Sequence, residues 1–122
     1  MDDKTTIKQL KELVKEFCEE RDWDQYHNAK DLAIGIITES SELLEHFRFK
    51  SEEEVNGLFK NKIKKDEISE ELADVLFFIL RLAEKYHIDL SDELKKKLEK
   101  NIQKYPIEKA KGSNKKYTEY EK

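Results

Sequence analysis

The sequence predicts an all-α fold, and three observations carry this prediction. Three glycines and one proline in 122 residues leave little material for the tight turns that a sheet needs. The apolar residues, 37% of the chain, recur in periodic runs, so global disorder is not expected. The longest apolar stretches do not alternate with polar residues as strands do. We therefore expect one domain of four helices over residues 1–106, followed by a basic polar tail over 107–122.

The first two helices are bounded by capping residues. The first is expected over about residues 5–21, with one of its two leading threonines as the cap. The segment 22–28 breaks the pattern and carries a tryptophan, a tyrosine and a histidine, which indicates a loop packed against other residues. Asn28 is a suitable cap for a second helix over about 29–49. The charged segment 51–65 is expected to be a surface connection that includes one short helical turn.

The third helix, over about residues 66–86, is the most apolar part of the chain. From Val75 to Ala83 only Arg81 is polar. A helix that is apolar nearly all round must be covered on several sides, and three other helices can hardly do so. We therefore expect a homo-oligomeric interface at this helix.

A fourth helix is expected to start with Ser91 as its cap and to end at Tyr105-Pro106, since proline does not continue a helix easily. The tail that follows is basic, polar and glycine-containing. We expect it to be mobile when free and able to order over an anion bound in the active site.

Composition argues against several classes of partner. The net charge of −4, from 28 acids and 24 bases, gives no global basic field for nucleic acid. Cys18 is the single cysteine, so no internal disulfide can form, and it continues an apolar stripe that places it in the core. The N-terminus has no apolar signal region, and the longest apolar run, Val75–Leu80, is too short to span a bilayer. We expect a cytoplasmic protein without a nucleic-acid or membrane partner.

Two acidic pairs are candidates for a catalytic site. They are Glu39 and Glu42 on the second helix, and Glu71 and Asp74 on the third. A spacing of three residues puts each pair on one helix face, with Cβ atoms about 5–6 Å apart. Acids occupy 28 of 122 positions, so such pairs are common by chance. What distinguishes these two is their apolar flanks, which indicate that they lie on the inner parts of their helices.

Four carboxylates brought together inside the protein would repel one another, by about 4 kcal/mol per close pair at an effective dielectric near 20. Such a cluster either holds protons at raised pKa values or binds a cation. Oxygen-only ligands favour Mg²⁺, with Mn²⁺ as the other choice. The alternative is that the acids simply line the edge of an apolar stripe and bind no metal.

The fourth helix carries a candidate anion-binding face. Lys97, Asn101 and Lys104 are spaced four and three apart and therefore share one side of the helix. Lysine is a suitable point charge for the oxygens of a metal-bound triphosphate. The alternative is a solvated polar face.

Several segments resemble the MazG-like family, and its dCTP pyrophosphatase branch most closely. They are Glu20-Arg21-Asp22-Trp23-Asp24-Gln25-Tyr26-His27, Glu39-x-x-Glu42-Leu43, Glu70-Glu71-Leu72-Ala73-Asp74-Val75-Leu76 and Lys97-x-x-x-Asn101-x-x-Lys104-Tyr105-Pro106. The resemblance covers about residues 19–119 in order, with a gap around 51–65. One ExxE motif is weak evidence, whereas these segments in this order are specific.

This resemblance implies a helical subunit in a dimer, or in a tetramer of dimers, that splits a (deoxy)nucleoside triphosphate into the monophosphate and pyrophosphate. It implies that Mg²⁺ is held by four catalytic acids: Glu39, Glu42, Glu71 and Asp74. The phosphate and sugar contacts that it implies are Lys97, Asn101, Lys104 and Tyr105. Its nucleobase contacts fall on Trp23, His27 and Phe49, and Phe78 is a further expected substrate-binding residue. The expected substrate is dCTP or a modified dCTP, with a role in cleaning the nucleotide pool.

The chain departs from the dCTP branch at several positions. Phe49 stands where that branch has tryptophan, Phe78 where it has tyrosine, and Ala29 where it has proline. In addition, Thr38 precedes Glu39 where many members have a second glutamate. None of these changes touches the four presumed metal ligands, so they bear on the base preference and not on catalysis.

Two rival interpretations remain. A di-iron carboxylate bundle needs Glu-x-x-His motifs on two helices, and this chain offers one, Glu84-x-x-His87, at a helix end. The other rival is a non-catalytic protein of the same fold, which binds nucleotide without cleaving it or serves as a helical adaptor.

Overall fold

A computed structural model describes residues 1–121, and only Lys122, the last residue of the predicted tail, lies outside the described residues. The described chain is all-helical, which confirms the predicted class. The helices are α1 (Ile7–Glu20), η1 (Asp24–Tyr26), α2 (Ala29–Glu45), α3 (Glu52–Leu58), α4 (Lys62–Lys85), α5 (Leu90–Lys104), α6 (Ile107–Ala110) and η2 (Tyr117–Glu119), where η marks a 3-10 helix. They fall into two compact units, Met1–His87 and Ile88–Lys122. No helix among the described residues is long and apolar enough to cross a membrane.

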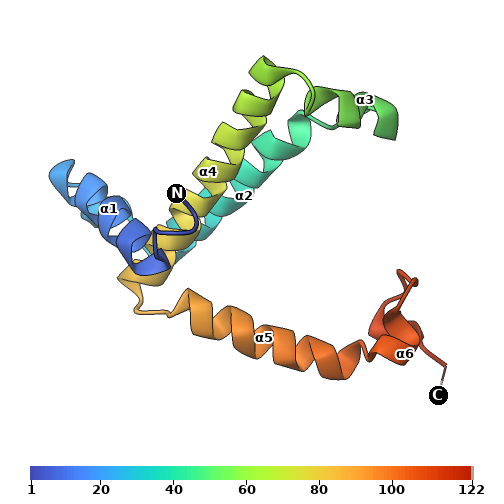
Figure 1. The fold of residues 1–122 in the computed structure, drawn as a ribbon. Coiled ribbons are helices and arrows are strands. Elements are labelled where there is room, and N and C mark those ends of the chain that lie inside the picture. The colour runs from blue at the N-terminus through green and yellow to red at the C-terminus, as the bar shows by residue number, and fades with distance from the viewer. Residues whose placement is uncertain (122) are drawn as a thin grey trace. The chain divides into compact units, whose positions relative to one another are not determined.

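The first unit is built on the pair α2 and α4, which lie side by side, with α1 packed on α4 and α3 at the end where α2 finishes (Figure 1). Its almost fully buried apolar side chains come from α1, α2 and α4: Cys18, Leu32, Ile68, Leu80 and Ala83. The placement of Cys18 confirms that it is a core residue. This core is small, and large apolar side chains of α2 and α4 remain exposed: Ile34, Ile37, Leu44, Leu72 and Leu76.

Gly35 allows α2 to approach α4 closely. A Cβ atom built on Gly35 would lie 2.6 Å from both Cδ1 and Cε1 of Phe78, far inside ordinary van der Waals contact. The ring of Phe78 therefore rests directly on the α2 backbone. Gly35 stands one helical turn before Glu39, so this contact sets the separation of α2 and α4 next to the first acidic pair.

Side-chain caps fix most of the helix starts. The Thr6 hydroxyl accepts a hydrogen bond from the Gln9 amide at 3.1 Å, and the Gln9 side chain accepts one from the Thr6 amide, which completes a capping box. Asn28 caps α2 by accepting a hydrogen bond from the Asp31 amide at 2.8 Å. These contacts confirm the caps that the sequence predicts for the first two helices.

Three predicted boundaries are wrong. The second helix ends at Glu45 and does not reach Phe49, whose φ of 62° is left-handed and incompatible with a continuing helix. The predicted surface connection holds α3 and also the first turn of α4, which Asn61 caps. The fifth helix is capped by Asp89 and not by Ser91, because the Asp89 carboxylate accepts the Asp92 amide hydrogen bond at 2.9 Å.

In the second unit, tyrosines join the residues after Pro106 to the end of α5. The Tyr105 ring packs edge-on against Tyr117 and Tyr120, at centroid distances of 5.8 and 6.0 Å. Lys104 places its ammonium 4.9 Å from the centre of the Tyr117 ring, in cation–π geometry. A pocket of about 520 Å³ in this unit is lined in part by Lys100, Lys104, Lys109, Tyr117 and Tyr120.

Candidate metal centre and substrate site

The two acidic pairs face each other across the contact between α2 and α4. One carboxylate oxygen from each of Glu39, Glu42 and Glu71 lies within 4.8 Å of the others. The fourth acid, Asp74, is exposed on α4, and its charge raises the pKa values of Glu39 and Glu71. Three of the four predicted residues therefore form one cluster, with Asp74 at its edge.

The electrostatics of this acidic cluster favour a proton or a cation. Partial burial, followed by the hydrogen bond and the charge of Glu42, raises the pKa of Glu39 to about 7. Desolvation, and then the charge of Glu42, also raises the pKa of Glu71. Glu39 Oε2 and Glu71 Oε2 are buried, and neither has a hydrogen-bond partner among the described residues. Since buried anionic oxygens are costly without a partner, and all the donors are oxygens, the cluster fits a hard divalent cation such as Mg²⁺ or Mn²⁺.

His46 lies beside the acidic cluster, and sequence reasoning missed it. Its Nε2 is 3.8 Å from Glu71 Oε1, and the two form an ion pair when the imidazole is protonated. His46 follows Glu42 by four residues, which is the spacing that brings two side chains to one side of a helix end. That spacing is the signal that could have identified it.

The predicted nucleobase contacts are only partly brought together. Trp23 and His27 are in edge contact, with ring centroids 6.2 Å apart, and Trp23 also packs edge-on against Phe17. Phe78 lies over Gly35 between α2 and α4. Phe49 is 92% exposed, with the Arg48 guanidinium 4.7 Å from its ring centre. Within the described chain, no ring contact joins Phe49 to the other three.

The predicted phosphate and sugar contacts all lie on α5 or at its end, in the second unit. Lys97 is exposed, whereas Asn101 and Lys104 are half-buried. Tyr105 is held by its two tyrosine neighbours. The α-helix through these residues places the three polar side chains on one face, as their spacing predicts.

Residues 34–120, which include both acidic pairs and the whole of α5, match the model described as the MazG-like family. The chain belongs to the MazG-like family.

Individual relatives agree with this assignment. The MazG-like chain is 35% identical to dCTP pyrophosphatase 1 of Rattus norvegicus and of Mus musculus, over 114 residues that cover 93% of this chain and 67% of each relative. Identity to dCTP pyrophosphatase 1 of Homo sapiens is 33% over the same length. A solved structure of a pyrophosphatase from Archaeoglobus fulgidus superposes with a TM-score of 0.76 at 38% identity, and the match covers 82% of this chain and 92% of that one. The predicted family is therefore confirmed, and so is its all-helical fold.

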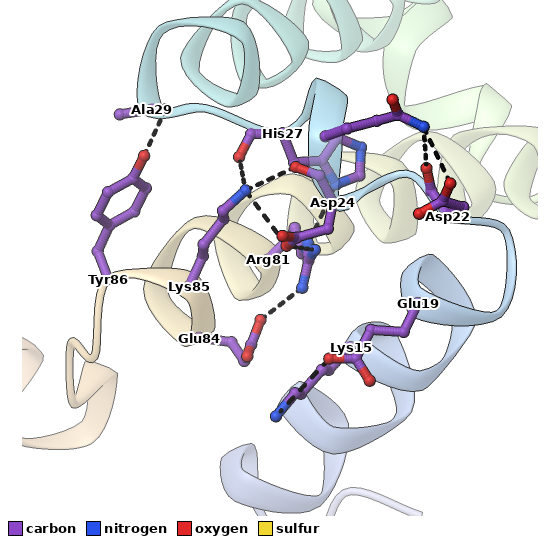
Figure 2. A network of polar contacts seen from close by, with 11 residues as sticks. Lys15, Glu19, Asp22, Asp24, His27, Ala29, Arg81, Glu84, Lys85 and Tyr86 are labelled. Atoms are coloured by element: carbon purple, nitrogen blue, oxygen red, sulfur yellow. Dashed lines mark hydrogen bonds and ion pairs between the residues drawn. The ribbon is translucent and has the colours of Figure 1, made fainter.

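This MazG-like chain also contains a polar network that sequence reasoning missed (Figure 2). Arg81 on α4 is 1% exposed, and its guanidinium pairs with Asp24 Oδ1 and Glu84 Oε2, both at 2.7 Å. Its Nε donates a hydrogen bond to His27 Nδ1 at 3.1 Å. Lys85 donates to the backbone oxygens of Asp24 and His27. Through these hydrogen bonds and ion pairs, the network holds the segment between α1 and α2 against the end of α4.

Proposed function

We propose that this MazG-like chain hydrolyses a (deoxy)nucleoside triphosphate, preferentially dCTP or a modified dCTP, to the monophosphate and pyrophosphate, and that the reaction depends on Mg²⁺. The family and the pyrophosphatase relatives place the chain among nucleoside triphosphate pyrophosphohydrolases. The preference for dCTP is supported by the names of the mammalian relatives. The observation that supports metal dependence is the acidic cluster with its two unpaired buried oxygens.

In this proposed reaction the acids of α2 and α4 would bind the metal ion. Glu39, Glu42, Glu71 and Asp74 would hold the cation, at a separation fixed by the contact between Gly35 and Phe78. A bound divalent ion lowers the pKa of water and neutralises phosphate charge. Water attacks the α-phosphorus and gives up a proton, the bond from that phosphorus to the bridging oxygen breaks, and pyrophosphate leaves. Positioning and charge neutralisation supply most of the catalysis in phosphoryl chemistry.

The remaining residues would bind the rest of the substrate. Lys97, Asn101 and Lys104 offer donors to phosphate oxygens, and Tyr105 offers a hydroxyl and a ring to the sugar. On this proposal the tail, residues 107–122, would order over the bound triphosphate. We also propose that the working enzyme is a homodimer or a tetramer of dimers, because exposed apolar side chains of α2 and α4 need cover.

A substrate panel tests the proposed function. Purified protein is assayed for pyrophosphate release from the canonical deoxynucleoside and ribonucleoside triphosphates and from 5-modified dCTP, with and without Mg²⁺. We expect dCTP or a modified dCTP to have the highest kcat/KM, and release to stop when EDTA removes the metal. Saturable binding of a triphosphate without pyrophosphate release would instead support the non-catalytic alternative.

The aromatic residues are expected to act on substrate affinity. We expect Trp23→Ala and Phe49→Ala to raise KM for dCTP several-fold with kcat nearly unchanged, since stacking on an aromatic face contributes about 1–3 kcal/mol per base. Tyr26→Ala is the matched control, because Tyr26 is 63% exposed in the same segment as Trp23 and is not an expected base contact. Steady-state kinetics and light scattering are measured together. Loss of the oligomer with unchanged KM would show that these rings only pack between subunits.

A further inference from the structure

We infer that Arg81 is a positioning residue that holds His27 as a neutral imidazole whose Nε2–H is presented to the bound nucleotide. This inference rests on the proposed nucleotide-binding function. Arg81 is the single polar residue in the run from Val75 to Ala83 and is almost fully buried, so its presence there calls for a physical reason.

Each of the three nitrogens of the Arg81 guanidinium has a separate partner. Nη1 pairs with Glu84 on the same helix and Nη2 with Asp24 in η1, so two carboxylates balance the buried charge. Nε remains, and it donates to His27 Nδ1 at 3.1 Å. Because both Nη atoms are paired, the planar guanidinium cannot rotate and its Nε–H stays directed at the imidazole. A lysine ammonium would not have this fixed orientation. Figure 2 shows the two acids on either side of Arg81.

This hydrogen bond decides where the imidazole carries its proton. A neutral imidazole has one N–H, and Nδ1 must offer its lone pair to Arg81, so the proton is on Nε2. No described residue hydrogen bonds to Nε2, which leaves that N–H available to a ligand. The edge contact with Trp23 further restricts the ring, and the bond from Lys85 to the His27 backbone oxygen restricts the backbone that carries it.

The surrounding charges keep the ring neutral. Partial burial, and then the positive charges of Arg81 and Lys85 on α4, lower the pKa of His27, whereas Asp24 in η1 opposes them. Protonation would also place an N–H of the imidazolium against the Arg81 N–H. His27 is therefore a hydrogen-bond donor with a single tautomer at neutral pH, suited to an acceptor oxygen or nitrogen on the ligand.

The test compares a double variant with a matched single variant. Arg81→Met/Glu84→Gln removes the bond to His27 without leaving Glu84 as a buried unpaired charge, whereas Glu84→Gln alone keeps Arg81 in place. Long-range ¹⁵N–¹H spectra of the ligand-free protein, recorded from about pH 5 to pH 8, report the tautomer and the pKa of each imidazole. The chain has three histidines, and His27→Gln assigns the signal of His27.

In the unmodified protein and in Glu84→Gln, we expect His27 to be the Nε2–H tautomer with a pKa below its ordinary value. In the double variant, we expect the other tautomer to appear and the pKa to rise. The KM for the best triphosphate should rise about 10-fold with kcat within about 2-fold, as for the loss of one substrate hydrogen bond.

Two results would overturn the inference. One is an unmodified protein whose His27 carries its proton on Nδ1 or is charged at pH 7. The other is a folded double variant with unchanged tautomer, pKa and KM, which would show that Arg81 only fastens the loop. If the double variant does not fold, Arg81→Lys, which keeps the charge and loses the fork, tests the tautomer and KM, whereas the pKa of His27 should then stay low because the positive charge remains. Because the spectra need no substrate, a failure of the proposed function is distinguishable from a failure of this inference.

Discussion

We expect the replacement of any one of Glu39, Glu42, Glu71 or Asp74 with alanine to lower turnover at least ~100-fold, a loss of about 2.7 kcal/mol in transition-state stabilisation. On the proposed mechanism, each acid would contribute to the position and charge of one cation, and phosphoryl chemistry tolerates little displacement of that charge. Pyrophosphate release under saturating substrate and Mg²⁺ measures the effect. Near-normal rates in any two of the four variants would contradict the assignment.

Stability measurements separate this effect from misfolding. Removing one acid relieves repulsion in the metal-free cluster, so the variants should unfold at the same temperature as the unmodified protein or higher when EDTA is present. Added Mg²⁺ should raise the unfolding temperature of the unmodified protein and have little effect on the variants, because a ligand stabilises only the state that binds it. Glu70→Gln is the matched control, since Glu70 is an exposed neighbour of Glu71 on α4. It should keep both the rate and the response to Mg²⁺.

Leu76→Lys is expected to dissociate the oligomer. Leu76 is 41% exposed on α4, and the proposed interface would cover it. An unpaired ammonium in an apolar interface costs several kcal/mol, which is enough to move a dimer at low micromolar concentration to monomers. Light scattering and sedimentation at that concentration measure the change.

The control for this experiment is Glu12→Lys, a charge change at an exposed position of α1. It should leave the mass unchanged. The prediction fails if the unmodified protein is itself a well-folded monomer at low micromolar concentration.

The local features of the fold were predictable from the sequence. Helical periodicity gave the all-α class, and the side chains at Thr6 and Asn28 gave two helix starts, because a cap is decided by residues within one turn. The acidic pairs were predictable for a related reason. Spacing put each pair on one helix face, and the apolar flanks indicated the inner parts of the helices. This holds for Glu39 and Glu71, which meet between α2 and α4, whereas Glu42 and Asp74 are exposed.

Features that depend on distant residues were not predictable. Arg81 and Asp24 are 57 positions apart, and no spacing rule indicates that they form an ion pair. The start of α5 was not decided by local rules, because Asp89 and Ser91 are both good capping residues. In the structure the cap is Asp89. The left-handed backbone at Phe49, four residues after the end of α2, was not predictable either, because nothing in that residue type favours it.

The contact between Gly35 and Phe78 has a consequence for how substitutions in this protein are interpreted. Position 35 carries no functional group, yet a side chain there would force the Phe78 ring to move, one turn from Glu39. If α4 moves with that ring, the two halves of the acidic cluster separate. In a screen of random variants, alterations at this glycine should therefore be as damaging as loss of a carboxylate. The absence of a Cβ atom at position 35 therefore allows the close approach of Phe78 to α2 beside the acidic cluster.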